Sequence, residues 1–346
     1  MIKVGLNGFG RIGRSIFRIN LKKKYFDIVA INDVNPSNEN LAYLLKYDSF
    51  YGRLKNDIAA NKEKIIIDDN EVVVYHHESI ADVLWEEQNI DIIIDASGIN
   101  QNLKEAKKLK VRGIKNCIVT HSPDEVDFTI IMGVNEDKLD IQENFLISSS
   151  ICDANAFSPV MHVLNEHYIV EHGFLTTLHP WLGYQNILDG PSRSFAYPGE
   201  IYENFALGRA STEALILKTT SCIKASKKVI PFINDNFQSL SYRVPIPLVS
   251  SADISVKLSK RVTKEEIISL FKKKEQEQKI KIFYNNFESL ISKDFIGSDY
   301  SAIIDHRWTD VNKFNYAKLI LWYDNEWGYS SRVVDIVNFI NNFWDR

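Results

Sequence analysis

The sequence predicts an α/β protein of two domains, in which a parallel-sheet domain precedes an α+β domain with a mixed or antiparallel sheet. The chain of 346 residues is long enough for about two domains of roughly 150 residues each. In residues 1–150, short apolar runs alternate with charged stretches of helical spacing, which is typical of a parallel sheet with right-handed crossovers. From residue 152 onward, one helical stretch is followed by several strand-like runs, so a second and different sheet is expected.

The strands expected in the first domain are apolar runs bounded by glycine or polar residues. They cover residues 2–7, 28–32, 65–67, 72–75, 90–95, 117–120 and 128–132. Residues 68–71 separate two of these runs and predict a hairpin. Helices are expected over residues 15–24, 40–47 and 103–110, and the first of them has the basic end that suits a helix C-terminus.

The second part of the chain is expected to begin with a helix over roughly residues 155–166. The predicted strands that follow cover residues 174–178, 242–245, 254–258 and 319–323. Thr263 with Glu266 three residues later forms a capping-box pattern, which predicts a helix over residues 263–274. Apolar positions at helical spacing over residues 330–341 predict a final helix.

The composition limits the class of protein and its partners. With 45% hydrophobic and 25% charged residues, the chain resembles an average globular protein and not a disordered, collagen-like or disulfide-stapled one. A formal net charge of −4 gives no support to nucleic-acid binding, which needs a basic face. The sequence contains no apolar run of about 18 residues, so no membrane span is expected. The three cysteines show no CxxC spacing and the N-terminus has no signal pattern, so we expect a cytoplasmic protein without a metal site.

A glycine motif follows the first predicted strand and precedes the first predicted helix. Gly8, Gly10 and Gly13 form GxGxxG, whose backbone N–H groups can receive a pyrophosphate at the helix N-terminus. Asp33 ends the second strand 20 residues after Gly13, where a carboxylate can bind ribose hydroxyls and repel a 2′-phosphate. These residues predict a Rossmann-type domain that binds NAD in preference to NADP. The alternative is a simple glycine turn with an incidental aspartate.

Three further residues lie where predicted strands end. Ser97 and Gly98 follow the strand over residues 90–95, and Thr120 ends the strand over residues 117–120. Since the carboxyl ends of parallel strands share one edge of the sheet, these residues are candidates for the nicotinamide side of the groove. Each one alone is more often an ordinary turn residue.

A cysteine and a histidine form the candidate catalytic pair. Cys152 lies between a strand and a predicted helix, and a helix N-terminus is expected to lower the pKa of a thiol. His179 follows a strand 27 residues later, and a thiol beside an imidazole is an activated nucleophile. The alternatives are a buried, inert cysteine and a structural histidine.

Many separate runs of the sequence resemble the glyceraldehyde-3-phosphate dehydrogenase superfamily, in the right order along nearly the whole chain. They are NGFGRIGR at 7–14, INDVN at 31–35, LLKYDSFYGRL at 44–54, MGVN at 132–135, SICDAN at 150–155, RVPIP at 243–247, FIGSDYSAIID at 295–305 and WYDNEWGYS at 322–330. The resemblance implies an NAD-binding domain over residues 1–151 and 326–346 and a catalytic domain over residues 152–325. It also implies a homotetramer.

The resemblance implies a role for individual residues. Cys152 would attack an aldehyde to give a thiohemiacetal and then a thioester, with His179 as the base, and the Cys152 N–H and the His179 imidazole would stabilise the oxyanion. Asn325 would hold the nicotinamide carboxamide, and Tyr329 would pack near the ring. Around the glycine loop, Arg11 and Ile12 would contact the cofactor through backbone N–H groups, and Asn7 would steady the loop.

The sequence departs from the family pattern around the thiol, where family members that make acyl phosphates bind anions. Ile151 and Asp153 flank the nucleophile in place of serine and threonine, and Leu182 stands where a threonine is expected. Thr220-Ser221 corresponds to a Thr-Gly phosphate-binding pair. The remaining candidate substrate residues are arginines, namely Arg193, Arg209 and Arg243.

These departures suggest a change in how the thioester is discharged. Apolar groups remove partners for a hydrated anion, and desolvating an unpaired anion costs several kcal/mol. Asp153 adds a like charge beside incoming phosphate. We therefore expect water to discharge the thioester to a carboxylate, and an extended segment over residues 190–208, with Tyr197 and Tyr202, to shape the substrate pocket. The alternatives are the standard phosphorylating enzyme and a catalytically silent NAD-binding regulatory protein.

Overall fold

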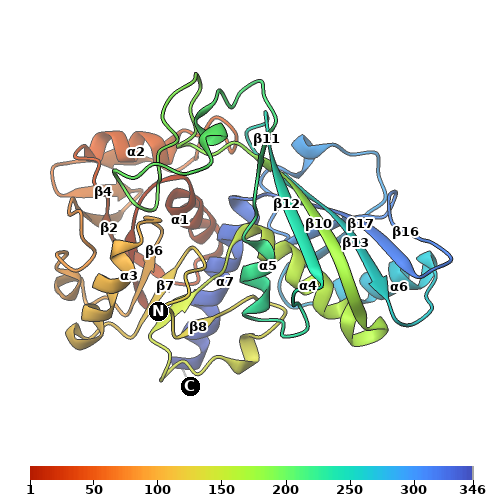
Figure 1. The fold of residues 1–346 in the computed structure, drawn as a ribbon. Helices are drawn as coiled ribbons and strands as arrows, with labels where there is room; N and C mark the ends of the chain where they lie inside the picture. The colour runs from red at the N-terminus through yellow and green to blue at the C-terminus, as the bar shows by residue number, and fades with distance from the viewer. Residues whose placement is uncertain (345–346) are drawn as a thin grey trace. The chain divides into compact units, whose positions relative to one another are not determined.

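The computed structural model describes residues 1–344 and divides the chain into two compact units (Figure 1). The first unit contains Met1–Ile130, Asp137–Ser149 and the chain from Ser330 onward. The second contains Ile131–Glu136 and Ser150–Tyr329. The α/β fold class with two different sheets is therefore as predicted. None of the helices within residues 1–344 combines the length and the apolarity that crossing a membrane requires.

The first unit is built on a nine-stranded sheet with the order β3-β4-β5-β2-β1-β6-β7-β9-β8. Its strands are β1 (Lys3–Asn7), β2 (Asp27–Asn32), β3 (Ile58–Ala60), β4 (Lys64–Ile67), β5 (Asn70–Tyr75), β6 (Ile92–Asp95), β7 (Asn116–Val119), β8 (Phe128–Thr129) and β9 (Leu146–Ser148). The pairs β1–β2, β1–β6, β6–β7 and β7–β9 are parallel, and the predicted hairpin is the antiparallel pair β4–β5. The strand expected over residues 128–132 is shorter, since β8 ends at Thr129.

The helices of the first unit connect these strands. They are α1 (Arg11–Lys23), α2 (Asn38–Lys46), α3 (Gln101–Ala106) and the part of α7 (Trp327–Trp344) that starts at Ser330. The central strands are buried on both faces, as the fully buried Leu6, Ile31 and Ile93 show. Short 3-10 turns in the chain are η1 (Trp85–Gln88), η2 (Lys107–Arg112), η3 (Glu136–Lys138), η4 (Phe205–Gly208) and η5 (Ser292–Phe295).

The second unit is built on an eight-stranded mixed sheet with the order β11-β12-β10-β13-β17-β15-β14, in which β16 also pairs with β17. Its strands are β10 (Val170–Pro180), β11 (Ile216–Lys218), β12 (Phe237–Val244), β13 (Ser250–Leu258), β14 (Phe283–Asn286), β15 (Ala302–Asp305), β16 (Asp310–Val311) and β17 (Tyr316–Tyr323). Its helices are α4 (Cys152–Tyr168), α5 (Cys222–Lys227) and α6 (Lys264–Glu277). The predicted capping box is present, with Thr263 as the N-cap of α6.

The two faces of this sheet differ. Helix α4 packs against β10, β13 and β15, and α5 packs against β12. Along β10 the side chains of Leu175, Thr177 and His179 are buried, whereas Phe174 is 61% exposed and Leu178 is 40% exposed. Since neighbouring side chains of a strand point to opposite faces, His179 belongs to the helix-covered face and Phe174 to the open face.

Candidate active site

The glycine loop is shaped by three different requirements. Gly8 has φ +89°, and a Cβ there would lie 2.6 Å from the backbone nitrogen of Ser97. A Cβ on Gly13 would lie 2.2 Å from the carbonyl oxygen of Gly8. By contrast, a Cβ on Gly10 would have no atom within 4 Å, so the loop backbone is open to a ligand at this position. The loop leads directly into α1, whose first N–H groups have no acceptor within the helix.

Side chains at the ends of the central strands hold this loop. Asn7 donates to Asp95 Oδ1 at 2.9 Å and accepts from Asn32 at 2.7 Å. The backbone N–H of Phe9, inside the glycine loop, donates to Asp33 Oδ2 at 2.6 Å. A carboxylate has about four lone-pair sites, so Asp33 can support the loop and still accept ribose hydroxyls.

The other residues expected on the nicotinamide side meet at one edge of the sheet. The backbone N–H of Ser97 donates to Asp95 Oδ1 at 3.1 Å, and the Thr120 hydroxyl donates to the Asp95 carbonyl at 3.1 Å. Gly98 has φ +69°, a conformation that favours glycine. The side chain of Arg11, in contrast, forms an ion pair with Asp48, which leaves its backbone as the part that can face a cofactor.

Cys152 and His179 are brought together as predicted. Cys152 is the first residue of α4, three residues before the expected start of the helix, and His179 lies near the end of β10. The Sγ atom of Cys152 lies 3.6 Å from Nε2 of His179. The other ring nitrogen, Nδ1, lies 2.8 Å from the carbonyl oxygen of Pro180, so it carries the hydrogen and Nε2 presents its lone pair to the thiol.

Burial and the nearby guanidinium of Arg243 lower the pKa of His179 to about 4. The imidazole is therefore neutral at pH 7 and can accept a proton from the thiol. The pair consists of a thiol and a neutral base.

The expectation of a lowered thiol pKa is wrong. Burial raises the pKa of Cys152 well above its ordinary value, and the carboxylate of Asp153 raises it further. The dipole of α4 does not overcome these two effects, because desolvation and the adjacent carboxylate both disfavour the thiolate. Both effects hold Cys152 in its thiol form.

Asp153 is buried and is the centre of the hydrogen-bond network around the thiol. Its Oδ1 accepts from the Tyr323 hydroxyl at 2.8 Å and lies 3.5 Å from Cys152 Sγ. Its Oδ2 accepts from the Thr220 hydroxyl at 3.2 Å. The hydroxyl of the expected phosphate-binding pair is thus directed at a carboxylate of the same chain.

Two cations lie on the same face of the sheet. His179 and Arg243 are register partners on β10 and β12, and Ile216 pairs with Arg243 from β11, two residues before Lys218. Burial lowers the pKa of Lys218, and so does Arg243, while Asp153 opposes the shift. Arg243 is 6% exposed, and within residues 1–344 no acceptor bonds to its Nε. A buried guanidinium with this unused donor can bind an anionic group of a substrate.

The other candidate substrate residues are more exposed. Ile151 is the N-cap of α4, and Leu182 lies two residues beyond β10; both are partly exposed. Ser221 is exposed at the start of α5. Arg209 is exposed and pairs with Asp189 at 2.8 Å, and Arg193 is exposed beside a bridge to Ile201. The structure does not bring these two arginines into the cluster around Cys152, and their roles stay predictions.

Two candidate residues late in the chain, Asn325 and Tyr329, bind backbone groups of residues with positive φ. Asn325 Oδ1 accepts from the N–H of Val249 at 3.1 Å, and the Tyr329 hydroxyl donates to the Ser150 carbonyl at 3.1 Å. Val249 has φ 70° and Ser150 has φ 60°, in a region that non-glycine residues seldom adopt. Such strain is concentrated at functional sites.

Three residues of the site were missed in the sequence. Tyr323 binds Asp153, Lys218 lies beside Arg243, and Tyr184 forms a hydrogen bond to Arg243 that opposes the rise in its own pKa caused by burial. Lys218 had a weak signal, because it ends an apolar run at a strand position. The roles of Tyr323 and Tyr184 depend on contacts that only the folded sheet shows.

The combination of a glycine-loop dinucleotide unit with a thiol and a neutral imidazole is typical of a dehydrogenase that uses a cysteine nucleophile. Two family models match the chain: the NAD-binding domain of glyceraldehyde 3-phosphate dehydrogenase over residues 2–103 and its C-terminal domain over residues 151–325. The chain belongs to the glyceraldehyde-3-phosphate dehydrogenase family, and it is an NAD-dependent aldehyde dehydrogenase of that type.

Curated relatives match over nearly the whole chain. Glyceraldehyde-3-phosphate dehydrogenase 2 of Streptomyces avermitilis is 35% identical over 342 residues, which is 99% of both chains. The glyceraldehyde-3-phosphate dehydrogenase of Geobacillus stearothermophilus is 36% identical, with 98% of each chain covered. Glyceraldehyde-3-phosphate dehydrogenase 1 of Kluyveromyces lactis is 33% identical over 98% of this chain and 100% of its own.

Proposed function

We propose that this enzyme oxidises a phosphorylated or related sugar-derived aldehyde through a Cys152 thioester, and that water discharges the thioester to a carboxylate. The proposal rests on the carboxylate of Asp153, which lies 3.5 Å from Cys152 Sγ and accepts the Thr220 hydroxyl. The names of the relatives make glyceraldehyde 3-phosphate the first aldehyde to test.

Acylation uses the thiol and the neutral imidazole. His179 takes the thiol proton as sulfur adds to the aldehyde carbon, returns it to the alkoxide of the thiohemiacetal, and takes it again as the thioester forms. NAD, when bound, accepts the hydride that leaves this carbon. The Cys152 N–H and the imidazole are the proposed donors to the oxyanion. Arg243, with its unused buried donor, is the proposed partner of the substrate's anionic group.

Discharge then uses Asp153. A water molecule attacks the thioester carbonyl while the carboxylate takes its proton, the C–S bond breaks, and Cys152 leaves as a thiolate that is protonated again. Inorganic phosphate is disfavoured in the same place, because the Asp153 carboxylate repels it and already accepts the hydrogen bond of the Thr220 hydroxyl. Ile151 and Leu182 add apolar surface where a hydrated anion needs donors.

The decisive experiment compares products with and without phosphate. The native enzyme is expected to form NADH and acid at a rate that phosphate does not raise, and Asp153→Asn is expected to form NADH in a single burst of one equivalent per site and then stop. Asp153→Thr, which restores the residue of the family pattern, should gain phosphate-dependent turnover. Strong phosphate dependence and an acyl phosphate product in the native enzyme would show instead that this is the standard phosphorylating enzyme.

The cofactor site is proposed to follow the sequence prediction. We propose that the first unit holds NAD through Asn7, the glycine loop with Arg11 and Ile12, Asp33, Ser97, Gly98 and Thr120, and that Asn325 and Tyr329 act on the nicotinamide. The domain boundaries proposed for these roles remain residues 1–151 with 326–346, and 152–325. The loop geometry and the network of Asn7, Asp33 and Asp95 support this assignment.

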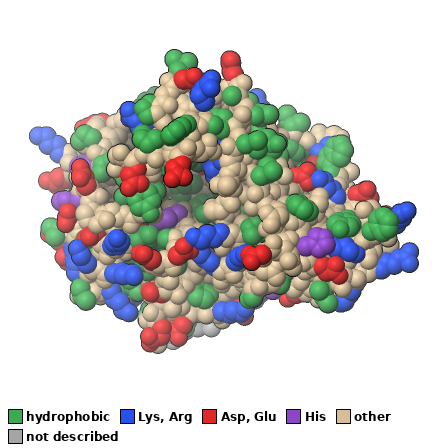
Figure 2. Space-filling view, viewed as in Figure 1, with side chains coloured by type: hydrophobic (Ala, Val, Ile, Leu, Met, Phe, Trp, Pro, Cys, Tyr) green, Lys and Arg blue, Asp and Glu red, His purple; other side chains and the backbone are tan. Residues whose placement is uncertain are grey.

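We also propose that the enzyme is a homotetramer whose subunits meet through the open face of the second sheet. Large apolar side chains are exposed there, which usually marks a protein interface. They are Phe174, Leu178, Leu217, Leu240, Trp308 and Tyr316. Figure 2 shows hydrophobic side chains at the surface in the region where Figure 1 places β10, β11 and β12.

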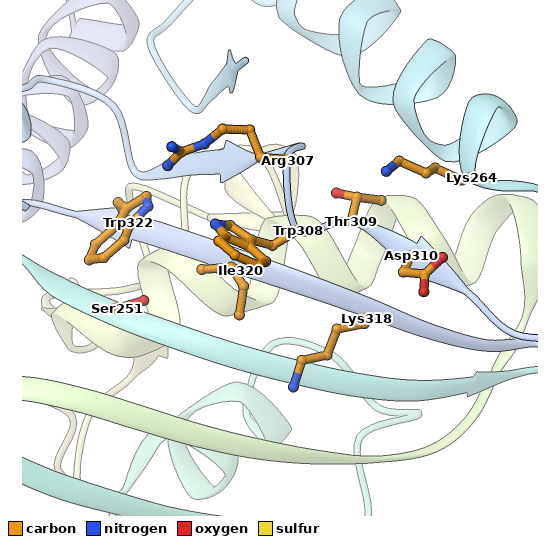
Figure 3. Close-up of a pocket in the computed structure, with 9 residues that line it drawn as sticks. All are labelled: Ser251, Lys264, Arg307, Trp308, Thr309, Asp310, Lys318, Ile320 and Trp322. Atoms are coloured by element: carbon orange, nitrogen blue, oxygen red, sulfur yellow. The ribbon is translucent and has the colours of Figure 1, made fainter. Parts of the chain in front are cut away.

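The same face is hollowed next to β17. A pocket of about 670 Å³ lies between Trp308, Ile320 and Trp322 with Lys264, Arg307 and Lys318 around it (Figure 3). A protruding side chain of a second subunit fits such an apolar floor with a charged rim. Phe174→Glu should produce smaller species in sedimentation, whereas Leu84→Glu, at an exposed site of the first unit, should not.

We further propose a cytoplasmic, reducing location, because Cys152 must stay a thiol and all three cysteines are free.

A further inference from the structure

The residue that follows the nucleophile gives the active site a third metal-binding side chain. Cys152, Asp153 and His179 each present one ligand atom, and these atoms all lie within 4.8 Å of one another. We propose that the three side chains form an inhibitory site for Zn²⁺, with the fourth coordination position open to water. This inference does not depend on how the thioester is discharged.

Two of the three distances between the ligand atoms are those of a tetrahedral zinc site. With Zn–S of about 2.3 Å and Zn–N or Zn–O of about 2.0–2.1 Å, tetrahedral angles place sulfur about 3.5–3.6 Å from each of the other two ligands. In the structure, Cys152 Sγ lies 3.6 Å from His179 Nε2 and 3.5 Å from Asp153 Oδ1. The sulfur–nitrogen and sulfur–oxygen distances therefore need almost no change to accommodate the metal.

Hydrogen bonds to the surroundings hold two of the three ligands, His179 and Asp153. A zinc-bound histidine usually donates its other ring N–H to a carbonyl or carboxylate, and His179 Nδ1 lies 2.8 Å from the Pro180 carbonyl oxygen. The carboxylate of Asp153 is held by the hydroxyls of Tyr323, at 2.8 Å, and Thr220, at 3.2 Å. Such outer hydrogen bonds fix the geometry of ligands before the metal arrives.

The chemistry of the three groups favours zinc over harder cations. Thiolate and imidazole are preferred ligands of Zn²⁺, whereas Mg²⁺ and Ca²⁺ require oxygen. Binding replaces the thiol proton, which leaves to solvent, with the metal. The cations Arg243 and Lys218 lie close enough to affect His179, so they oppose a further positive charge. We therefore expect weaker binding than at a four-ligand structural site, and binding that a chelator reverses.

The experiment measures binding directly, with Zn²⁺ and Co²⁺ as the probes. Competition with a chromophoric chelator should give one Zn²⁺ per chain, and Co²⁺ should show a thiolate charge-transfer band. Asp153→Asn and Asp153→Thr should each weaken Zn²⁺ binding more than tenfold, and Cys152→Ser should abolish the band. Cys117→Ala, at a buried cysteine of the first unit, is the matched control and should bind as the native enzyme does.

Two results would overturn the inference. If both Asp153 variants bind Zn²⁺ as tightly as the native enzyme, the carboxylate is not a ligand. If Cys152→Ser retains the band or the stoichiometry, the metal is bound elsewhere. NAD binding by each variant, measured by fluorescence, verifies that the protein is folded, so weak metal binding cannot be mistaken for unfolding.

Discussion

Replacing Asp153 by asparagine should make Cys152 more reactive toward a neutral alkylating reagent. The carboxylate lies 3.5 Å from Sγ and raises the pKa of the thiol. Two unit charges at that distance repel by about 5 kcal/mol at an effective dielectric constant of about 20. Arg243 and Lys218 oppose this repulsion, yet one third of it, about 1.6 kcal/mol, would change the thiolate population more than tenfold.

The assay is the rate of modification by iodoacetamide at pH 7, followed by mass spectrometry. Asp153→Asn should react more than ten times faster than the native enzyme. Asp235→Asn removes a carboxylate that is fully exposed and pairs with Lys227, so it should react at the native rate. An unchanged or slower rate for Asp153→Asn from pH 6 to pH 9 would refute the idea that Asp153 holds the nucleophile in its thiol form.

Three further predictions test the cofactor loop, the proposed base and the buried His306. Gly8→Ala should weaken NAD binding more than tenfold in a fluorescence titration, because its Cβ would lie 2.6 Å from Ser97, whereas Gly183→Ala meets no atom and should bind normally. His179→Asn should lower kcat by about 10²–10⁴-fold with little effect on NAD affinity, and a smaller loss would contradict its role as base. Burial lowers the pKa of His306 from 6.5 to about 4, so the unfolded chain binds the proton first and the free energy of unfolding should fall by up to about 3 kcal/mol as the pH drops from 6.5 to 4. Denaturant unfolding at pH 7 and pH 5 should show a smaller fall for His306→Asn than for the native enzyme, and equal falls would contradict this.

The parts of the fold that depend on local sequence were predictable. The glycine loop between β1 and α1 follows from the spacing of three glycines, and the capping box at Thr263 fixes the start of α6. The β4–β5 hairpin was expected from its polar turn. Each of these signals lies within about a dozen residues, so a single sequence contains it.

The electrostatics of the site could not be predicted in the same way. The helix N-terminus at Cys152 is a local feature and indicated a lowered thiol pKa, but burial and Asp153 reverse the direction. Tyr323 reaches Asp153 from 170 residues away in the chain, which requires the register of the second sheet. The ion pair between Arg209 and Asp189 is likewise a contact that the sequence did not predict.

A single side chain therefore links three properties of this active site. Asp153 raises the pKa of the Cys152 thiol and accepts a hydrogen bond from the Thr220 hydroxyl. Its carboxylate also has an oxygen within 4.8 Å of the ligand atoms of Cys152 and His179. The first property makes acylation depend on His179 as base, since little thiolate exists without it. In our proposals, the second favours water over phosphate, and the third allows a metal to bind Cys152. Because all three act through one carboxylate, Asp153→Thr should change thiol reactivity, phosphate dependence and zinc binding together, and a variant that changed only one of them would show that the properties have separate causes.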